Sequence, residues 1–458
     1  MGISRRTFMQ GTALAAAALG TGTAAADTNW ARLRKRLGSR LVLPQDPGYD
    51  QIRLPYNEVY AYRRPAAIAK CVRTEDVQAC LDFASHERIP VAARSGRHSY
   101  AGYSAPENGL IVDLSAFNDV QVRGTHVQAG TGTRLDNFYE AIGAQGRSVP
   151  AGSCRSVGLG GLALGGGIGV TARKYGLTCD NLVSARIITP DGCLHTVSEH
   201  QEPDLFWALK GGGGGNFGIV TSFTFRSFPA PMITRFYVAY PGGATAEVVE
   251  AWQDWFENAP DELWGVCGTG AGSPTITEID GTYLGPAKDL NPLLDRLPKA
   301  PRRDVEELSY LDAMRFFAGG YETGFPFVAS SRMAYGRIDG ERVDELLTGR
   351  TNCRIQLDSF GGALGRIAPD ATAFPHRAAK TSAQVYVNVL DGRTEAEGRR
   401  IVASLRDGLG LGTTGYVNYI DPEMPDWPTA YYGRNVARLR KVRRRYDPDR
   451  VLGFQQGL

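Results

Sequence analysis

Residues 150–169, PAGSCRSVGLGGLALGGGIG, combine one cysteine, Cys154, with a dense series of glycines. Glycine lets the backbone turn tightly and approach a ligand closely, and the N–H groups at such turns suit the phosphates of a nucleotide cofactor. Apolar residues alternate through the glycines, as in a buried, structured segment and unlike a solvated linker. The stretch therefore predicts a cofactor-binding element in preference to a flexible loop.

Other kinds of cofactor site fit the sequence less well. No Gly-Lys-Ser/Thr follows the glycines, which excludes a Walker loop, and their spacing matches the dinucleotide fingerprint only weakly. The six histidines are dispersed and the seven cysteines include no CxxC pair, which argues against a metal site.

The first residues carry a targeting pattern. Residues 4–9, SRRTFM, contain an arginine pair, and a mild apolar run ends in three alanines at Ala26. That run is too short and too rich in Ala and Gly to anchor stably in a membrane. We therefore expect a twin-arginine export signal over residues 1–26, transient contact with the twin-arginine translocation machinery, and a secreted or extracytoplasmic protein. In that compartment Cys71 and Cys80 could form a disulfide.

Composition limits the remaining choices. The chain has 458 residues, 43% of them hydrophobic, so two or three domains are expected. The net charge of +3 gives no electrostatic reason to expect a nucleic-acid partner. The basic run at 438–445 is expected to be a solvated helix face.

Short strands and helices mix in the first part of the mature chain. The patterns predict helices over Thr74–Glu87 and Leu135–Gly143, a strand over 120–129, and a hairpin around the Pro-Asp-Gly at 190–192. A pair of prolines at Pro229 and Pro231 predicts a domain boundary.

The second part of the chain has a different pattern of predicted secondary structure. From 230 to 410, strands alternate with amphipathic helices, as in a sheet covered on one face by helices. The last segment, 411–458, is expected to begin with a strand at Tyr416 and to end with the basic helix. The predicted divisions are thus 1–26, 27–229, 230–410 and 411–458.

Several further segments occur in a fixed order along the chain. They are 94–100 (RSGRHSY), 152–158 (GSCRSVG) with its trailing glycines, 175–177 with 180–181, 205–208 with 211–220, 374–377 (FPHR), 416–421 (YVNYID), 431–433 and 446–448. Taken together, they resemble the berberine bridge enzyme-like FAD-linked oxidases of the vanillyl-alcohol oxidase superfamily. The resemblance implies an α+β fold: a two-subdomain PCMH-type FAD-binding domain plus a substrate domain with an antiparallel sheet covered by helices. The segment 411–458 would return to the FAD domain.

The resemblance also implies FAD bound covalently through two residues. His98 matches the histidine that bonds the flavin 8α-methyl carbon, and Cys154 matches the cysteine that bonds flavin C6. Both positions are electrophilic in oxidised flavin and accept attack by neutral imidazole or thiolate. Arg97 departs from the pattern, because the family usually has Gly there.

Further residues are implied to contact the cofactor. They are Arg94, Ser95, Gly96, Arg97, Ser99, Gly152, Ser153, Val157, Gly158, Gly160, Gly161, Gly218, Val220 and Asn418. In this family a small residue at the position of Val157 leaves oxygen access to the flavin, which favours an oxidase over a dehydrogenase.

The implied reaction is hydride transfer from a substrate alcohol to the flavin, with reoxidation by O2 to give H2O2. A tyrosine would remove the alcohol proton: Tyr416 is the first choice, with Tyr419 in the same motif and Tyr386 as a secondary candidate. A free phenol has a pKa of about 10, which must be lowered for this role. Tyr100 and Gln384 would contact the substrate, and Tyr175 would help to wall the pocket.

The sequence therefore predicts an exported FAD-dependent oxidase acting on a sugar, an oligosaccharide or a secondary metabolite. Its partners would be that small molecule and O2, with no metal and no stable membrane anchor. Two alternatives remain open: a dehydrogenase that uses another electron acceptor, and a non-catalytic secreted flavin-binding protein.

Overall fold

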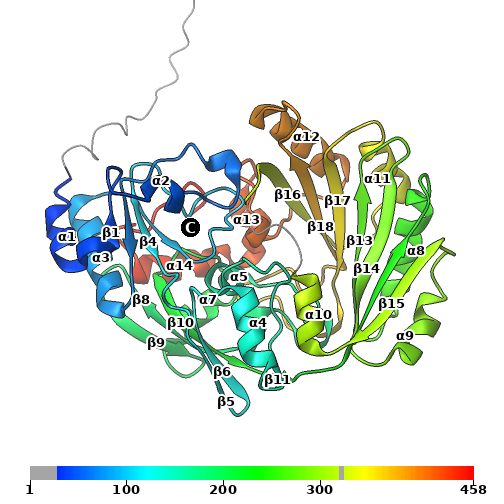
Figure 1. Cartoon of the computed structure of the whole chain (residues 1–458), viewed down its shortest axis with the longest axis horizontal. Helices are drawn as coiled ribbons and strands as arrows, with labels where there is room; N and C mark the ends of the chain where they lie inside the picture. Colours follow the sequence, from blue (N-terminus) through cyan, green and yellow to red (C-terminus); the bar gives the residue numbers. More distant parts are fainter. Residues whose placement is uncertain (1–27, 319–323) are drawn as a thin grey trace, which may run out of the picture.

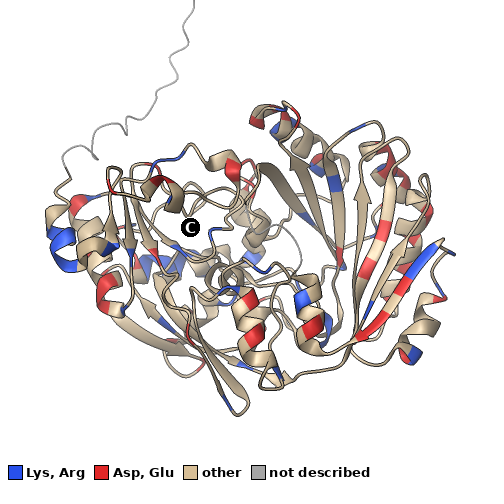
Figure 2. Ribbon diagram, in the orientation of Figure 1, with Lys and Arg blue, Asp and Glu red and all other residues tan. Residues whose placement is uncertain are grey.

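The computed structural model describes residues 28–318 and 324–458, which form two lobes joined along the middle of the molecule (Figure 1). The predicted export signal lies outside these residues. Residues of both charge signs are spread over both lobes (Figure 2). Within the described residues, no helix is long and apolar enough to cross a membrane.

The first subdomain is a small sheet in the order β1-β2-β4-β3. Its strands are β1 (Leu41–Val42), β2 (Ala67–Lys70), β3 (Val91–Arg94) and β4 (Leu110–Asp113), and its helices are α1 (Ala31–Leu37), α2 (Tyr49–Ile52) and α3 (Thr74–Glu87). The apolar face of α3 is buried in the core of this subdomain. Cys71 and Cys80 meet there as free thiols with their Sγ atoms 3.8 Å apart, so the possible disulfide is not formed.

The second subdomain is an antiparallel sheet in the order β5-β6-β10-β8-β9. Its strands are β5 (Val120–Arg123), β6 (His126–Gly130), β8 (Leu182–Ile188), β9 (Leu194–Ser198) and β10 (Ile219–Arg226); β7 (Arg147–Ser148) and β11 (Phe228–Pro229) pair beside it. Its helices are α4 (Leu135–Gly143), α5 (Leu159–Gly165), α6 (Ala172–Tyr175) and α7 (Pro203–Leu209). The single strand predicted over 120–129 is wrong, because the chain reverses at Gly124, which has a φ of 61°.

The other lobe is built on a seven-stranded antiparallel sheet in the order β15-β12-β14-β13-β17-β18-β16. Its strands are β12 (Ile233–Ala239), β13 (Leu263–Gly270), β14 (Ile276–Tyr283), β15 (Arg302–Leu308), β16 (Phe327–Ala334), β17 (Cys353–Ser359) and β18 (Thr381–Asn388). Its helices are α8 (Thr245–Glu257), α9 (Ala287–Leu294), α10 (Tyr310–Phe317), α11 (Gly340–Leu347) and α12 (Glu395–Gly408).

The two faces of this sheet differ. Helices α8, α11 and α12 lie on its outer face (Figure 1), where Ile355, Leu357 and Val385 join a buried apolar cluster. The inner face turns toward the first lobe. The predicted α+β class, with an antiparallel sheet covered by helices, is confirmed.

The C-terminal segment crosses back to the first lobe. Helices α13 (Trp427–Tyr432) and α14 (Val436–Tyr446) follow a short 3-10 turn, Val417–Tyr419, and Arg438 of α14 pairs with Asp204 of α7 at 2.7 Å. The strand predicted at Tyr416 is wrong, because the Tyr419 N–H donates to the Tyr416 carbonyl at 3.0 Å and curls the chain. Within the basic run, Arg443 is buried against Asp447 instead of being solvated.

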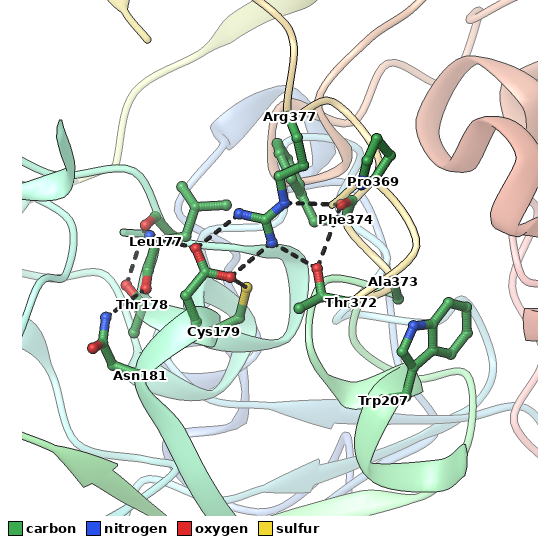
Figure 3. Close-up of polar contacts among 12 residues, drawn as sticks. Leu177, Thr178, Cys179, Asn181, Trp207, Pro369, Thr372, Ala373, Phe374 and Arg377 are labelled. Carbon is green, nitrogen blue, oxygen red and sulfur yellow. Dashed lines mark hydrogen bonds and ion pairs between the residues drawn. The ribbon is translucent and has the colours of Figure 1, made fainter. Parts of the chain in front are cut away.

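A buried ion pair joins the two lobes (Figure 3). Arg377 precedes β18 and donates from both terminal nitrogens to the carboxylate of Asp180, at 2.8 and 2.7 Å. Their side chains are 1% and 6% exposed. Asp180 also accepts from the Leu177 N–H, and Arg377 donates to Thr372, so the charges have hydrogen-bonding partners on both sides.

Replacing Arg377 with Met should strongly lower the stability of the folded protein. The change leaves the carboxylate of Asp180 buried and unpaired, which costs about 3–5 kcal/mol. The measurement is the midpoint of urea-induced unfolding, followed by circular dichroism. Arg366→Met is the matched control, because its pair with Asp261 is exposed and contributes about 0–1 kcal/mol. Equal effects of the two substitutions would contradict this assignment.

Candidate active site

A cavity of about 1210 Å³ lies between the first lobe and the inner face of the seven-stranded sheet. Loops of the first lobe form one wall, polar side chains of β17 and β18 form the other, and the 3-10 turn at Val417–Tyr419 closes it between them. Ordinary small-molecule pockets have volumes of about 300–1,000 Å³. This cavity therefore has room for a large cofactor together with a substrate.

The loop at residues 95–100 leaves β3 and enters the cavity wall. Its position depends on Arg94, whose guanidinium is 2% exposed and donates to Asp113 at 2.6 Å. Arg94, predicted as a cofactor contact, does not line the cavity; it lies behind the loop and supports it. Gly96 lets this loop touch the cysteine loop, because a Cβ at Gly96 would lie 2.1 Å from the Gly158 nitrogen.

His98 faces the cavity from this loop. Its Nε2 lies 2.9 Å from the Ser156 hydroxyl, and its ring stacks on Tyr56 with the centroids 3.7 Å apart. Burial, with the nearby positive charges of Arg97 and Arg134, lowers the pKa of His98 to about 3. The imidazole is therefore neutral and keeps a lone pair for bonding to an electrophile.

Cys154 lies in the same cavity, at a turn closed by the bond from the Val157 N–H to the Cys154 carbonyl (3.1 Å). The cavity leaves its thiol accessible, although burial raises the pKa of Cys154, partly offset by a hydrogen bond from Ser153. Two side chains suited to covalent attachment thus share one cavity.

The remaining cofactor-contacting residues predicted from the sequence do line this cavity. They are Ser95, Gly96, Arg97, Ser99, Gly152, Ser153, Val157, Gly158, Gly160, Gly161, Gly218, Val220 and Asn418. Gly161 borders open space, since a Cβ there would meet no atom within 4 Å, whereas Gly96, Gly158 and Gly218 are packed closely against neighbouring atoms.

The tyrosines divide into two groups. Tyr419 lines the cavity, with its ring stacked on Tyr100 at 5.5 Å, and Tyr386 lines it beside Phe327. Gln384 donates to the Tyr100 hydroxyl at 2.7 Å. Both residues, which the sequence predicted to contact the substrate, therefore line the cavity.

Two predicted tyrosines lie elsewhere. Tyr416 is 1% exposed and does not line the cavity, because its hydroxyl accepts from the Gly167 N–H and the Asn418 amide, both at 2.8 Å. It supports the glycine loop from behind, whereas Tyr419 of the same motif lines the cavity. Tyr175 is also outside the cavity, stacked on Phe228 at 4.1 Å.

Three polar residues of β17 were missed by the sequence prediction. Arg354, Gln356 and Asp358 face the cavity at every second position, while Ile355 and Leu357 face the helices. This alternation, characteristic of a strand with one polar face, is the signal that could have revealed them.

Asp358 is the most unusual of these residues. Its side chain is buried, with the residue only 3% exposed, and its Oδ2 has no hydrogen-bonding partner among the described residues. Burial, reinforced by the neighbouring carboxyl of Asp280, raises the pKa of Asp358 to about 7. A carboxyl group that titrates near neutral pH is suited to accept a proton during a reaction.

Comparison with known proteins shows the family to which the chain belongs. Family models match residues 65–198 (FAD binding domain) and 415–458 (berberine and berberine like). An uncharacterized FAD-linked oxidoreductase of Bacillus subtilis, YgaK, is 34% identical over 93% of this chain and 98% of its own length. The chain belongs to the berberine bridge enzyme-like FAD-linked oxidoreductases.

Other members of the berberine bridge enzyme-like family are also similar along most of the chain. Xylooligosaccharide oxidase of Thermothelomyces thermophilus is 30% identical, with 88% of this chain and 89% of its own covered. The solved structure of Physcomitrella patens BBE-like 1 superimposes with a TM-score of 0.89 at 26% identity, covering 94% and 99% of the two chains.

The residues present fit FAD, the cofactor of this family. The cavity has the necessary size, a glycine-lined wall that borders open space at Gly161, and a guanidinium, that of Arg97, which donates to a backbone carbonyl. Its two reactive side chains, neutral His98 and accessible Cys154, match chemistry that a flavin ring accepts.

Proposed function

We propose that this protein is an exported oxidase that converts the alcohol of a saccharide to a carbonyl compound and reduces O2 to H2O2. The observation that carries the proposal is the single cavity in which His98 and Cys154 face Tyr419 and Asp358. The similarity to xylooligosaccharide oxidase supports a carbohydrate substrate. The polar face of β17 and β18 supports it too, because Gln356, Gln384 and Arg354 offer hydrogen-bond donors and acceptors to hydroxyl groups.

His98 and Cys154 would hold the cofactor. The imidazole would bond the 8α-methyl carbon and the thiolate would bond C6, as in the family pattern. When bound, FAD would accept the hydride, with its two electrons, that leaves the substrate carbon. Two covalent links would keep the cofactor in place in a protein that operates outside the cytoplasm.

Tyr419 and Asp358 would relay and accept the hydroxyl proton of the substrate alcohol. Burial raises the pKa of Tyr419 well above its ordinary value, and Asp358 raises it further, so Tyr419 remains protonated at neutral pH. A tyrosine in that state hydrogen-bonds and positions the alcohol, and can pass a proton on. Asp358, with its pKa of about 7, is therefore the residue that finally accepts the alcohol proton.

Val157 supports an oxidase in preference to a dehydrogenase. It lines the cavity three residues after Cys154, where a small side chain leaves room for oxygen. The export signal proposed over residues 1–26 would deliver the folded protein through the twin-arginine machinery to an extracytoplasmic location, where both saccharides and O2 are available.

Covalent attachment can be tested on purified protein by acid precipitation and intact mass. We expect the flavin absorbance to remain in the pellet, with the mass increased by one FAD. His98→Ala and Cys154→Ala should each retain flavin through the other link, while the double variant should release it. Flavin in the wild-type supernatant would contradict double attachment.

The reaction class can be tested with a panel of monosaccharides, oligosaccharides and aromatic alcohols. We expect oligosaccharides to reduce the flavin and to yield one H2O2 for each substrate molecule oxidised. Turnover with an artificial electron acceptor but not with O2 would favour the dehydrogenase alternative. Absence of flavin reduction by every compound would favour the flavin-binding alternative.

Asp358→Asn should lower kcat/KM about 100- to 10,000-fold, the usual contribution of a general base. In the wild type, kcat/KM should fall as the pH drops through about 7, because Asp358 becomes protonated. Asp280→Asn is the matched control: it should remain active and shift this fall to lower pH, because it removes a like charge. Unchanged pH profiles in both variants would contradict the role of Asp358.

A further inference from the structure

Arg97 occupies a backbone conformation that suits glycine. Its φ of 67° lies in the left-handed region, which bulky residues rarely adopt. A long side chain at such a position is retained against a conformational preference, and residues of this kind concentrate at functional sites. Arg97 also lies directly beside His98, at the wall of the cavity.

Arg97 forms no direct ion pair with the described residues. Its guanidinium donates to the Leu54 carbonyl at 3.3 Å, and no carboxylate lies within 4.0 Å of it in residues 28–318 and 324–458. The nearby arginines are paired, Arg94 with Asp113 at 2.6 Å and Arg134 with Asp136 at 3.4 Å. Arg97 is exposed at the cavity wall; partial desolvation and the charge of Arg94 lower its pKa, and the carboxylate of Asp113 offsets part of this shift.

The cavity wall holds more basic than acidic residues. Its charged lining residues are Arg63, Arg97, Arg155, Arg354, Glu107 and Asp358. Arg354 and Arg155 are paired with Glu278 and Asp136, at 2.8 and 3.7 Å, whereas Arg97 and Arg63 have no carboxylate within 4.0 Å among the described residues. FAD carries a diphosphate, and its flavin gains further negative charge when it is reduced.

We propose that Arg97 is a redox-tuning residue, whose charge favours the reduced state of the bound flavin. The inference rests on the proposed function for one premise, that the flavin is bound beside His98. On reduction, oxidised flavin takes up two electrons and one proton and becomes an anion. A cation fixed nearby stabilises that anion more than the neutral oxidised ring. Arg97 would thereby make the cofactor a stronger acceptor for electrons from an alcohol.

The test is the midpoint potential of the bound flavin, measured by titration with dithionite against a reference dye at pH 7. Arg97→Asn and Arg97→Gly remove the charge and introduce residues that tolerate a positive φ. Each should lower the equilibrium ratio of reduced to oxidised flavin about tenfold, a potential about 30 mV more negative for a two-electron couple. Arg97→Lys keeps the charge and should stay close to the wild type.

Arg88→Asn is the matched control. Arg88 is an exposed arginine that also has a positive φ, of 53°, and it does not line the cavity. Its substitution should leave the potential unchanged. The proposal would be overturned by a wild-type potential in Arg97→Asn or by loss of FAD from both neutral variants. A potential shift in Arg97→Lys as large as in the neutral variants would also overturn it. The titration needs no substrate, so it remains informative even if no saccharide is oxidised.

Discussion

The active-site architecture depends on the buried ion pair between Arg377 and Asp180. The pair fixes the turn at Thr178–Asn181, whose N–H groups at Thr178 and Cys179 bond the carbonyls of Gly167 and Gly166. The N–H of Gly167 in turn bonds the hydroxyl of Tyr416, so one contact between lobes is transmitted to the glycine loop and the 417–419 turn. Removing either charge would leave the other desolvated and unpaired, which makes the pair a strong constraint on how the lobes meet.

The packing of the two lobes against each other also determines the side chains that line the cavity and their pKa values. The inner face of the sheet contributes polar side chains, and the first lobe covers them with glycine-rich backbone and aromatic rings. Burial in this cavity raises the pKa of Asp358 and lowers that of His98. A carboxyl group that titrates near pH 7 and an imidazole that stays neutral are thus consequences of one recessed, weakly solvated space.

Much of the fold could be predicted, because it depends on local patterns. The helix over Leu135–Gly143 begins and ends where its apolar periodicity indicated, and the hairpin around 190–192 follows from its Pro-Asp-Gly turn. The errors have local causes too. A single glycine divides residues 120–129 into two strands, and Tyr416 lies at a turn whose hydrogen bonds are made with distant residues.

The sequence by itself determined the family and the α+β class, and most of the site residues that it predicted do line the cavity. Motifs such as RSGRHSY and GSCRSVG make this possible, because they carry backbone and side-chain requirements within a few residues. Only the tertiary structure decided which side chains reach the cavity. Tyr416 and Tyr419 are three residues apart in one motif, yet one supports the glycine loop and the other faces the cavity. Asp358 lies outside every motif. It lines the cavity because β17 pairs with its neighbouring strands and the sheet packs against the first lobe, and both arrangements depend on contacts between residues distant in the sequence.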